Sequence, residues 1–453
     1  MNLLSSQLAQ SQRAKISFAL AVAAASLGSS STSPFTWSVA SLTVVAASSS
    51  SVSPLHVATG LRNLGNTCYL NSQLQCAYHI PYVRQLVQNP PTITTKRSSI
   101  ASENNDSDDD DDDDPTVDDA EKEDQHAECS AALQALRVVF RDMERAAEQS
   151  SSFGVVPAPF ILCQTLGINV YEQQDSQEFW KLLLPVLKLP PLTDLYQGAF
   201  EDYIIGLDGS GRERRREEPF LDLGLNVVHG SVQASLKELF GEPELLSEAT
   251  GNGWRPEKGA AKINAHKGSL LRVQGLPSIL QLHLKRFQYD WNTDTTSKLN
   301  TPFTFPLELD LSTICQSDND DQSNKDQQKV LYDLQGVIVH AGEYGSGHYY
   351  AYVRPNLNCD TWYRFNDELV TKVTFKEVCQ DAFGGKLSGS EPADVDVTSK
   401  QNLWSRIKRA LQRNGDSYGY GGRTSNAYVL QYIRRCDISR LYLAKDSQEQ
   451  LAQ

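Results

Sequence analysis

The apolar positions along the chain change from a helical to an alternating pattern at about Leu195. Before this point they recur every three or four residues, which is the spacing of one helix face. Leu70 and Leu74 follow this repeat after Asn66 or Thr67, either of which can cap the start of a helix. The pattern predicts helices over residues 67–80, 131–148, 160–166 and 175–187.

After Leu195, apolar and polar residues alternate in short runs, as is typical of β-strands. Residues 278–287 carry a strong signal of this kind. The pattern predicts strands over residues 219–225, 278–287, 330–340, 349–354, 361–366 and 427–433. Because helices come first and strands second, the sequence predicts an α+β fold with a cleft between a helical lobe and a sheet lobe.

The distribution of charge and apolar residues also indicates insertions in the folded domain. The net charge of −14 is almost wholly local, since fourteen acidic residues and one lysine between Glu103 and Asp124 account for −13. Mutual repulsion and scarce apolar side chains predict a disordered insertion over residues 89–127. A second insertion, residues 386–422, contains an amphipathic basic helix that either covers the sheet lobe or binds a partner.

The folded domain is expected to run from residue 58 to residue 435. Residues 1–57 are rich in Ser and Ala and contain no acid, so they form either a disordered leader or a targeting segment. Residues 436–453 are expected to form a C-terminal tail. We expect the protein to be a monomer.

Composition narrows the classes of function and compartment. The chain has eight cysteines and no Cys-x-x-Cys pair, which favours free thiols in a reducing compartment such as the cytoplasm or nucleus. No run of about 20 apolar residues is present, so we expect no membrane span. No basic stripe stands out either, so a nucleic-acid partner gains no support.

Cys68 lies where the first helix is predicted to begin. The helix dipole and the free backbone N–H groups favour a negative group such as a thiolate there, which makes Cys68 a candidate nucleophile. Gly65, just before it, gives the turn room to approach a substrate backbone. The alternative for a lone cysteine is a packing role, and this reading is kept for the other thiols, Cys76, Cys163 and Cys379.

His348 follows a glycine-rich segment, residues 342–347, which is predicted to be a flexible turn before a strand. A histidine there can project into the cleft as the base that ionises the thiol, although a structural histidine is the alternative. Asn366 or Asp367 can accept a hydrogen bond from its second nitrogen. Asn63 and the Cys68 backbone N–H can donate to a developing oxyanion.

Several motifs, taken together, resemble the signatures of the ubiquitin-specific proteases, a papain-like class of deubiquitinating enzymes. The cysteine motif reads GLRNLGNTCYLNSQLQ over residues 60–75, and the histidine motif reads GHYYAYV over 347–353 and WYRFND over 362–367. Further matches are QQDSQEF over 173–179, LKRF over 284–287 and AYVLQY over 427–432. The resemblance covers residues 58–435, and such an ordered set is very specific.

The resemblance implies a right-hand architecture with a helical thumb that carries Cys68, a β-sheet palm that carries His348, and β fingers. The C-terminal tail of ubiquitin would enter between thumb and palm. Cys68 would attack the carbonyl of the last glycine, with His348 as base and then acid. Hydrolysis of the resulting thioester would release ubiquitin from modified proteins or chains.

The resemblance also assigns roles to single residues. Asn366 takes the third position of the triad, Asp367 supports it, and Asn63 stabilises the oxyanion. Asp175 and Glu178 would pair with arginines of the ubiquitin tail. Gly347 and Tyr349, on either side of the base, complete the predicted substrate-binding residues, and the glycines at 342, 345 and 347 would let a loop move aside.

The chain departs from the family in one respect. Many members carry two Cys-x-x-Cys pairs in the fingers that bind structural zinc, but no cysteine occurs between residues 164 and 314 here. His229, His266 and His283 are too few and wrongly spaced to replace them. We therefore expect no metal or other cofactor, and shortened fingers over about residues 217–275.

Two other functions stay open on the sequence. The chain could be a ubiquitin-binding module without catalysis, although such relatives usually lose the cysteine or histidine that this chain keeps. It could also be an isopeptidase for another ubiquitin-like protein, which the sequence separates poorly from ubiquitin. A zinc hydrolase is excluded because no cluster of residues has metal-ligand spacing.

Overall fold

The computed structural model describes residues 59–91, 130–148, 156–315, 329–384 and 424–442. The predicted leader 1–57, nearly all of the acidic insertion 89–127 and the insertion 386–422 with its basic helix lie outside these residues. Among the described residues, no helix is both long and apolar enough to cross a membrane.

The N-terminal lobe is helical, as predicted. Its helices are α2 (Cys68–Tyr78), α3 (Pro81–Gln88), α4 (Ala131–Glu148), α5 (Phe160–Thr165), α6 (Ser176–Leu187) and α7 (Pro190–Tyr196). The prediction for residues 131–148 matches α4 at both ends. The pattern missed α3 and α7, both of which begin with proline, because a proline that ends one helix is equally suited to the first turn of the next.

Helix α2 lies at the centre of the molecule, and all of its residues are buried. Most of its polar side chains make hydrogen bonds within the protein, as is usual for buried polar groups, although the Tyr69 hydroxyl has no partner among the described residues. Gln73 donates to the Ser176 carbonyl, and Gln75 donates to the Thr59 carbonyl. A helix that is surrounded on every side needs no purely polar face. The surrounding contacts hold the start of α2, and hence Cys68, against the rest of the protein.

The C-terminal half forms an eight-stranded main sheet, so the α+β prediction is confirmed. The strand order is β13-β12-β11-β10-β14-β6-β3, with β9 paired to β10 at the side. The strands are β3 (Leu223–Asn226), β6 (Ile279–Lys285), β9 (Glu308–Asp310), β10 (Leu331–Glu343), β11 (Ser346–Val353), β12 (Trp362–Asn366), β13 (Leu369–Val373) and β14 (Asn426–Arg434). All neighbours are antiparallel except β3 and β6.

Both faces of the main sheet are covered. Ile338, Ala351 and Val429 lie in the apolar cluster shared with helices α2–α7. The opposite face, including Val339 and Leu430, packs in a second cluster with helices α8 (Val232–Phe240) and α9 (Phe375–Ala382). Burial on both faces explains why the central strands read as nearly continuous apolar runs.

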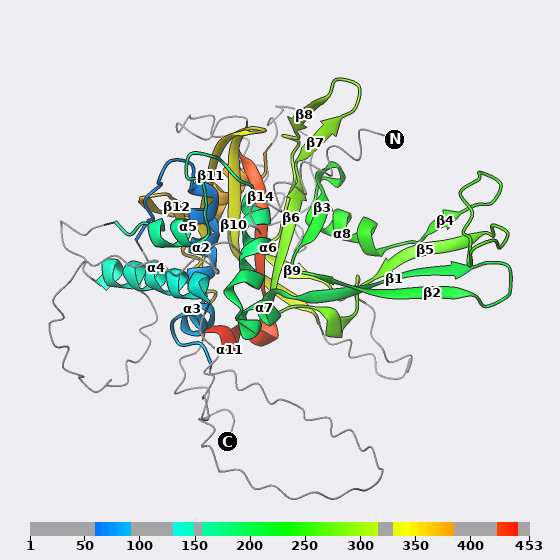
Figure 1. Cartoon of the computed structure of the whole chain (residues 1–453), viewed down its shortest axis with the longest axis horizontal. Coiled ribbons are helices and arrows are strands. Elements are labelled where there is room, and N and C mark those ends of the chain that lie inside the picture. The colour runs from blue at the N-terminus through cyan, green and yellow to red at the C-terminus, as the bar shows by residue number, and fades with distance from the viewer. Residues whose placement is uncertain (1–58, 92–129, 149–155, 316–328, 385–423, 443–453) are drawn as a thin grey trace, which may run out of the picture.

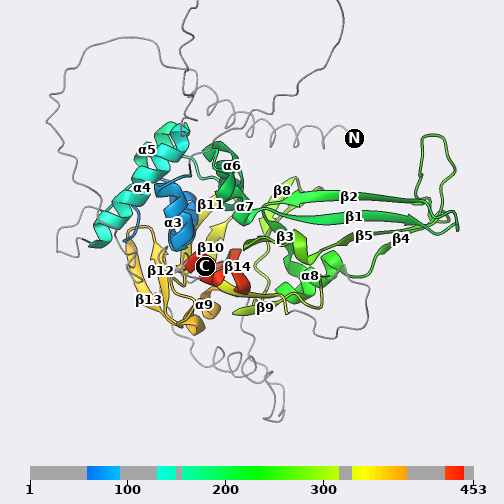
Figure 2. The ribbon, with the colours of Figure 1, turned by 90° about the horizontal axis from the view of Figure 1, so that it is seen from below.

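A second, four-stranded sheet extends away from the helical lobe (Figures 1 and 2). Its order is β2-β1-β5-β4, with β1 (Gly198–Gly206), β2 (Glu213–Phe220), β4 (Glu244–Leu246) and β5 (Ala265–Leu270). The predicted bounds of 217–275 for the fingers are therefore wrong at the start, since β1 begins at Gly198. The shortening expected relative to the family stays a prediction.

The strand predicted over 219–225 is two strands in two different sheets. Strand β2 ends at Phe220 in the projecting sheet, and β3 begins at Leu223 in the main sheet. The run 278–287 is divided similarly, because β6 ends at Lys285 and Phe287 starts the hairpin of β7 (Phe287–Asp290) and β8 (Thr295–Lys298). Alternation of apolar and polar residues predicts an extended backbone, but it does not identify the sheet in which the strand pairs.

The C-terminal end of the described chain packs on the helical lobe. After β14 come the short turn η3 (Arg435–Asp437) and helix α11 (Ile438–Tyr442), which contacts α3. Leu441 is fully buried there. The folded part therefore extends past residue 435 into the segment predicted to be a tail, and residues 443–453 lie outside the described chain.

Candidate active site

Cys68 is the first residue of α2, as predicted, and is buried. The preceding loop is held by Asn63, whose Oδ1 accepts hydrogen bonds from the backbone N–H groups of Gly65 and Thr67, both at 3.0 Å. Gly65 has a φ of 143°, and a Cβ there would lie 2.6 Å from the Val170 carbonyl oxygen. Glycine is thus required there for packing inside the helical lobe, and the approach to a substrate backbone stays a prediction.

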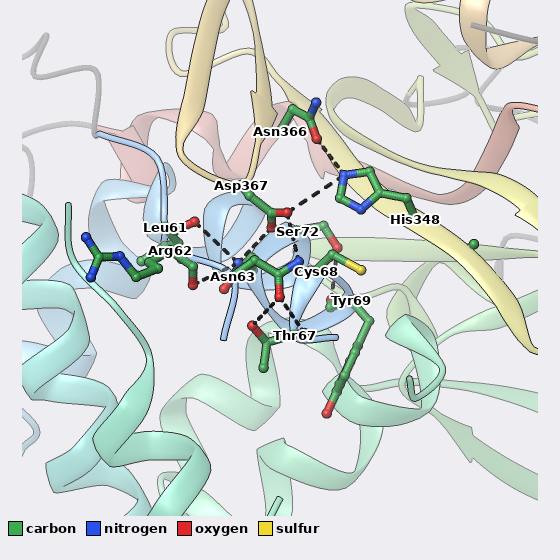
Figure 3. Close-up of polar contacts among 12 residues, drawn as sticks. Leu61, Arg62, Asn63, Thr67, Cys68, Tyr69, Ser72, His348, Asn366 and Asp367 are labelled. Atoms are coloured by element: carbon green, nitrogen blue, oxygen red, sulfur yellow. Dashed lines mark hydrogen bonds and ion pairs between the residues drawn. The ribbon is translucent and has the colours of Figure 1, made fainter. Parts of the chain in front are cut away.

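His348 lies on β11 and faces the start of α2 (Figure 3). The flexible turn predicted over residues 342–347 is wrong, because Gly342 pairs with Gly347 and Glu343 pairs with Ser346 in the β10–β11 hairpin. Only two residues, Tyr344 and Gly345, connect the strands. The pairing of β10 with β11 therefore holds the backbone next to His348.

The two ring nitrogens of His348 have different surroundings. Nε2 lies 2.6 Å from Asn366 Oδ1, and because this oxygen accepts, Nε2 carries the proton. Asp367 Oδ2 lies 3.8 Å from the same nitrogen. The Cys68 thiol is the ring's other polar partner, which leaves Nδ1 to face the sulfur (Figure 3). The arrangement has the geometry that a nucleophile, a base and an orienting acceptor need in a thiol hydrolase.

Burial tends to lower the pKa of His348, since it disfavours the charged ring. The hydrogen bonds to Cys68 and Asn366, together with the negative charges of Cys68 and Asp367, outweigh burial and raise the pKa to about 9. The ring is therefore held as an imidazolium at neutral pH. His340, which lies below Gly347, behaves oppositely, because burial lowers its pKa to about 3 and keeps it neutral.

Asp367 joins the sheet to the helical lobe. Its carboxylate accepts hydrogen bonds from Asn63 Nδ2 at 3.0 Å and from Asn71 Nδ2 at 2.9 Å. Its backbone oxygen accepts from the Leu61 N–H at 2.9 Å. The side-chain amide of Asn63, predicted to serve the oxyanion, is thus turned toward Asp367 (Figure 3).

The predicted substrate-binding residues lie at the start of α6 and on either side of His348 in β11. Asp175 caps α6, because its Oδ1 accepts from the N–H groups of Gln177 and Glu178, and its Oδ2 accepts from the Tyr428 hydroxyl. Glu178 is in the first turn of the same helix. Tyr349 as a whole is 3% exposed, and its ring packs on His340 and Tyr428.

The sequence left two contributors to the site unassigned. Gln173 Nε2 lies 3.8 Å from Cys68 Sγ and donates to the Gly347 carbonyl at 2.8 Å, so it bridges the two lobes above the thiol. Gln173 belongs to the QQDSQEF motif, which was the available signal.

Lys298, on β8, is 7% exposed and donates to the carbonyls of His340, Gly342 and Thr424. It thereby fixes the strand opposite His348. A lone lysine in a short polar strand gave no signal of this role.

The described residues offer no metal centre. No group of three or more His, Cys, Asp or Glu side chains within them could hold a metal ion. The seven cysteines in the described ranges are free thiols.

Comparison with known proteins agrees with the motifs. Residues 59–432 match the family model described as ubiquitin carboxyl-terminal hydrolase. The chain is 30% identical over 393 residues to ubiquitin carboxyl-terminal hydrolase 15 of Schizosaccharomyces pombe, covering 84% of this chain and 28% of the relative.

Two further relatives come from a plant and from budding yeast. Identity to ubiquitin C-terminal hydrolase 12 of Arabidopsis thaliana is 30% over 405 residues, covering 86% of this chain and 30% of the relative. Identity to ubiquitin carboxyl-terminal hydrolase 15 of Saccharomyces cerevisiae is 32% over 394 residues, covering 83% and 27%. The chain thus spans less than a third of the length of these relatives. The resemblance read from the motifs is confirmed, and the chain belongs to the ubiquitin carboxyl-terminal hydrolase family, with its α+β, papain-like fold.

Proposed function

We propose that the protein is a thiol-dependent deubiquitinase that hydrolyses the bond after the C-terminal glycine of ubiquitin on modified proteins or chains. The observation that carries this proposal is the arrangement of His348, with Nε2 on Asn366 Oδ1 at 2.6 Å and the Cys68 thiol as its other partner. Family membership supplies the substrate class. Ubiquitin and ubiquitinated proteins are therefore the proposed partners.

In the proposed reaction the Cys68 proton moves to His348 Nδ1, and the sulfur attacks the glycine carbonyl carbon. The raised pKa of His348, about 9, favours its taking up this proton. As the C–N bond breaks, the imidazolium gives its proton to the departing amine and a thioester remains. His348 then takes a proton from water, whose oxygen attacks the thioester carbonyl carbon. The C–S bond breaks, ubiquitin leaves with a free carboxylate, and the Cys68 sulfur recovers the proton from His348.

Asn63 is the proposed side-chain donor to the oxyanion, together with the Cys68 backbone N–H at the start of α2. The Asn63 amide has two hydrogens, and the bond to Asp367 at 3.0 Å uses one of them. Asn366 orients the ring, and Asp367 supports it with negative charge. Hydrogen bonds to an oxyanion often reach their final geometry only when the substrate is bound.

Asp175, Glu178, Gly347 and Tyr349 are the proposed binding residues for the ubiquitin tail. Entry of the tail between the lobes requires Gln173 to release the Gly347 carbonyl, which it holds at 2.8 Å. We place the protein in the cytoplasm or nucleus because the cysteines in the described residues are free thiols. A monomer without cofactor is the form that we propose.

Hydrolysis of ubiquitin carrying a C-terminal fluorogenic amide tests the proposal. The full chain should turn over this substrate, and Cys68→Ala should lose activity by on the order of 10⁴, because no other group replaces the nucleophile. Cys436→Ser is the matched control, since Cys436 is an exposed free thiol, and it should retain full activity. Turnover that survives Cys68→Ala would end the proposal, and ubiquitin binding without turnover would favour a non-catalytic module.

A further inference from the structure

A hollow lies beside the catalytic pair, on the side away from the predicted tail-binding residues. Its volume is about 460 Å³. Its lining residues come from the loop before α2, from β11 and from the β12–β13 turn, and they are Asn63, His348, Asn366, Asp367, Glu368 and Leu369. The last two have no role in the proposed chemistry.

The order of the main sheet separates the two sides of the site. Strand β11, which carries His348, lies between β12–β13 on one flank and β10–β14–β6 on the other. Asp175 is bound to Tyr428 of β14, and Gln173 is bound to Gly347 at the β10–β11 hairpin. The hollow is at the β12–β13 flank, and Figure 2 shows the projecting sheet on the opposite side of the molecule.

A substrate amide that crosses the catalytic pair must place its acyl part on one flank and its amine on the other. Building on the proposed function, we propose that the hollow at β12–β13 binds the leaving group, namely the lysine of the modified protein and the residues beside it. His348 lines this hollow, so the proton that it gives to the amine when the C–N bond breaks is delivered into it.

Glu368 and Leu369 set the chemistry that the hollow accepts. Leu369 is 60% exposed, which leaves an apolar surface for the methylene chain of a lysine or for a neighbouring side chain. Glu368 pairs with Arg62 at 3.3 Å, and both side chains are about half exposed. Among the lining residues, the carboxylates of Asp367 and Glu368 outnumber the single cation, the imidazolium of His348, so a basic residue beside the modified lysine is favoured over an acidic one.

Three substrates test this inference on the full chain. Two are ubiquitin joined by an isopeptide bond to the lysine of a short peptide, with either arginines or glutamates flanking that lysine. The third is ubiquitin with a C-terminal methyl ester, whose leaving group is too small to reach Glu368 or Leu369. The wild type should cleave the arginine peptide with a kcat/KM at least about threefold above that of the glutamate peptide, which is the scale of an exposed ion pair.

Glu368→Gln should bring this ratio close to one, and Leu369→Ser should lower kcat/KM for both peptides about fivefold, as expected for a partly buried leucine. Neither change should affect the ester. Helix α8 offers a matched control, because Glu238 and Leu239 are an exposed Glu-Leu pair in the same order, away from the site. Glu238→Gln and Leu239→Ser should leave all three rates unchanged.

The outcomes separate the inference from the proposed function. Normal ester hydrolysis with equal rates for the two peptides, or a ratio that Glu368→Gln does not change, overturns the leaving-group site alone. Absence of ester hydrolysis in the wild type overturns the proposed function and this inference with it. An equal effect of Leu369→Ser on ester and peptides would show damage to the catalytic pair and would also overturn the assignment.

Discussion

At the scale of single residues, the state of His348 follows from which groups surround it. Burial alone would favour a neutral ring, as it does for His340 on the neighbouring strand. Asn366 and Cys68 bind the ring nitrogens of His348, and Asp367 adds negative charge, so its charged form is favoured instead. Two histidines on paired strands thus differ in charge at neutral pH, because only one of them has acceptors within reach.

The pH dependence of activity tests this account. The pKa of His348 is about 9 in the folded protein against 6.5 without these partners, so the imidazolium needed to protonate the amine is lost as pH rises through about 9. Its contribution to stability follows the same sign, being complete below about 6.5 and lost by the time pH passes 9.

Asn366→Ala removes one of the groups that raise the pKa, so the alkaline limb of kcat/KM should move to lower pH and the rate should fall at least tenfold. Rates of fluorogenic amide hydrolysis measured between pH 6 and 10 would show this. Asn358→Ala, in an exposed turn, is the control. An unshifted alkaline limb in Asn366→Ala would contradict the role given to Asn366.

At the scale of elements, local pattern gave the helices more faithfully than the strands. Helix α4 was predicted over its full length because one of its faces is apolar and the other is exposed. Alternation of apolar and polar residues predicts a single strand over 219–225. In the structure the chain passes from the projecting sheet to the main sheet at Leu221 and Asp222. The pairing partner of a strand depends on contacts far away in sequence, which periodicity does not contain.

A substitution of Lys298 tests how β8 is held against β10. Its ammonium group donates to three backbone carbonyls, two of which flank Ala341, the residue paired with His348 across the hairpin. Lys298→Met keeps the length of the side chain but leaves these carbonyls without their donor, which should cost about 1–3 kcal/mol of unfolding free energy.

Urea denaturation measures this loss, and Lys372→Met on the exposed face of β13 should change stability by less than about 0.5 kcal/mol. Equal stability of the two variants would mean that the Lys298 hydrogen bonds contribute nothing net.

At the scale of the whole molecule, the active site is also where the two lobes are joined. Asn63 and Asn71 of the helical lobe donate to Asp367 of the sheet lobe, and Gln173 donates to Gly347. Cys68 and His348 are therefore held opposite each other by the same contacts that keep the lobes together.

A double-mutant cycle measures that connection. Asn71 is 3% exposed and donates to the Asp367 carboxylate at 2.9 Å, so Asn71→Ala and Asp367→Ala should show a coupling free energy of about 1.5–3 kcal/mol in unfolding.

The Arg62–Glu368 pair joins the same two lobes at 3.3 Å but is half exposed, so its coupling should stay below about 1 kcal/mol. Equal couplings for the two pairs would contradict the view that sheltering from water makes the Asp367 contact the stronger one.

The sequence by itself indicated the family and the proposed chemistry, because Cys68 at a helix start, His348 near the start of a strand and Asn366 at the end of the next are local signals within the family's motifs. It also determined the order of helices before strands. Tertiary structure alone decided that Asn63 faces Asp367, that Gln173 reaches across to Gly347, that the hairpin beside His348 is paired, and that a hollow opens at Leu369. Apart from the hairpin, which is local, these features depend on which distant segments meet. Hydrogen-bond partners separated by a hundred residues or more produce no periodic pattern in a sequence.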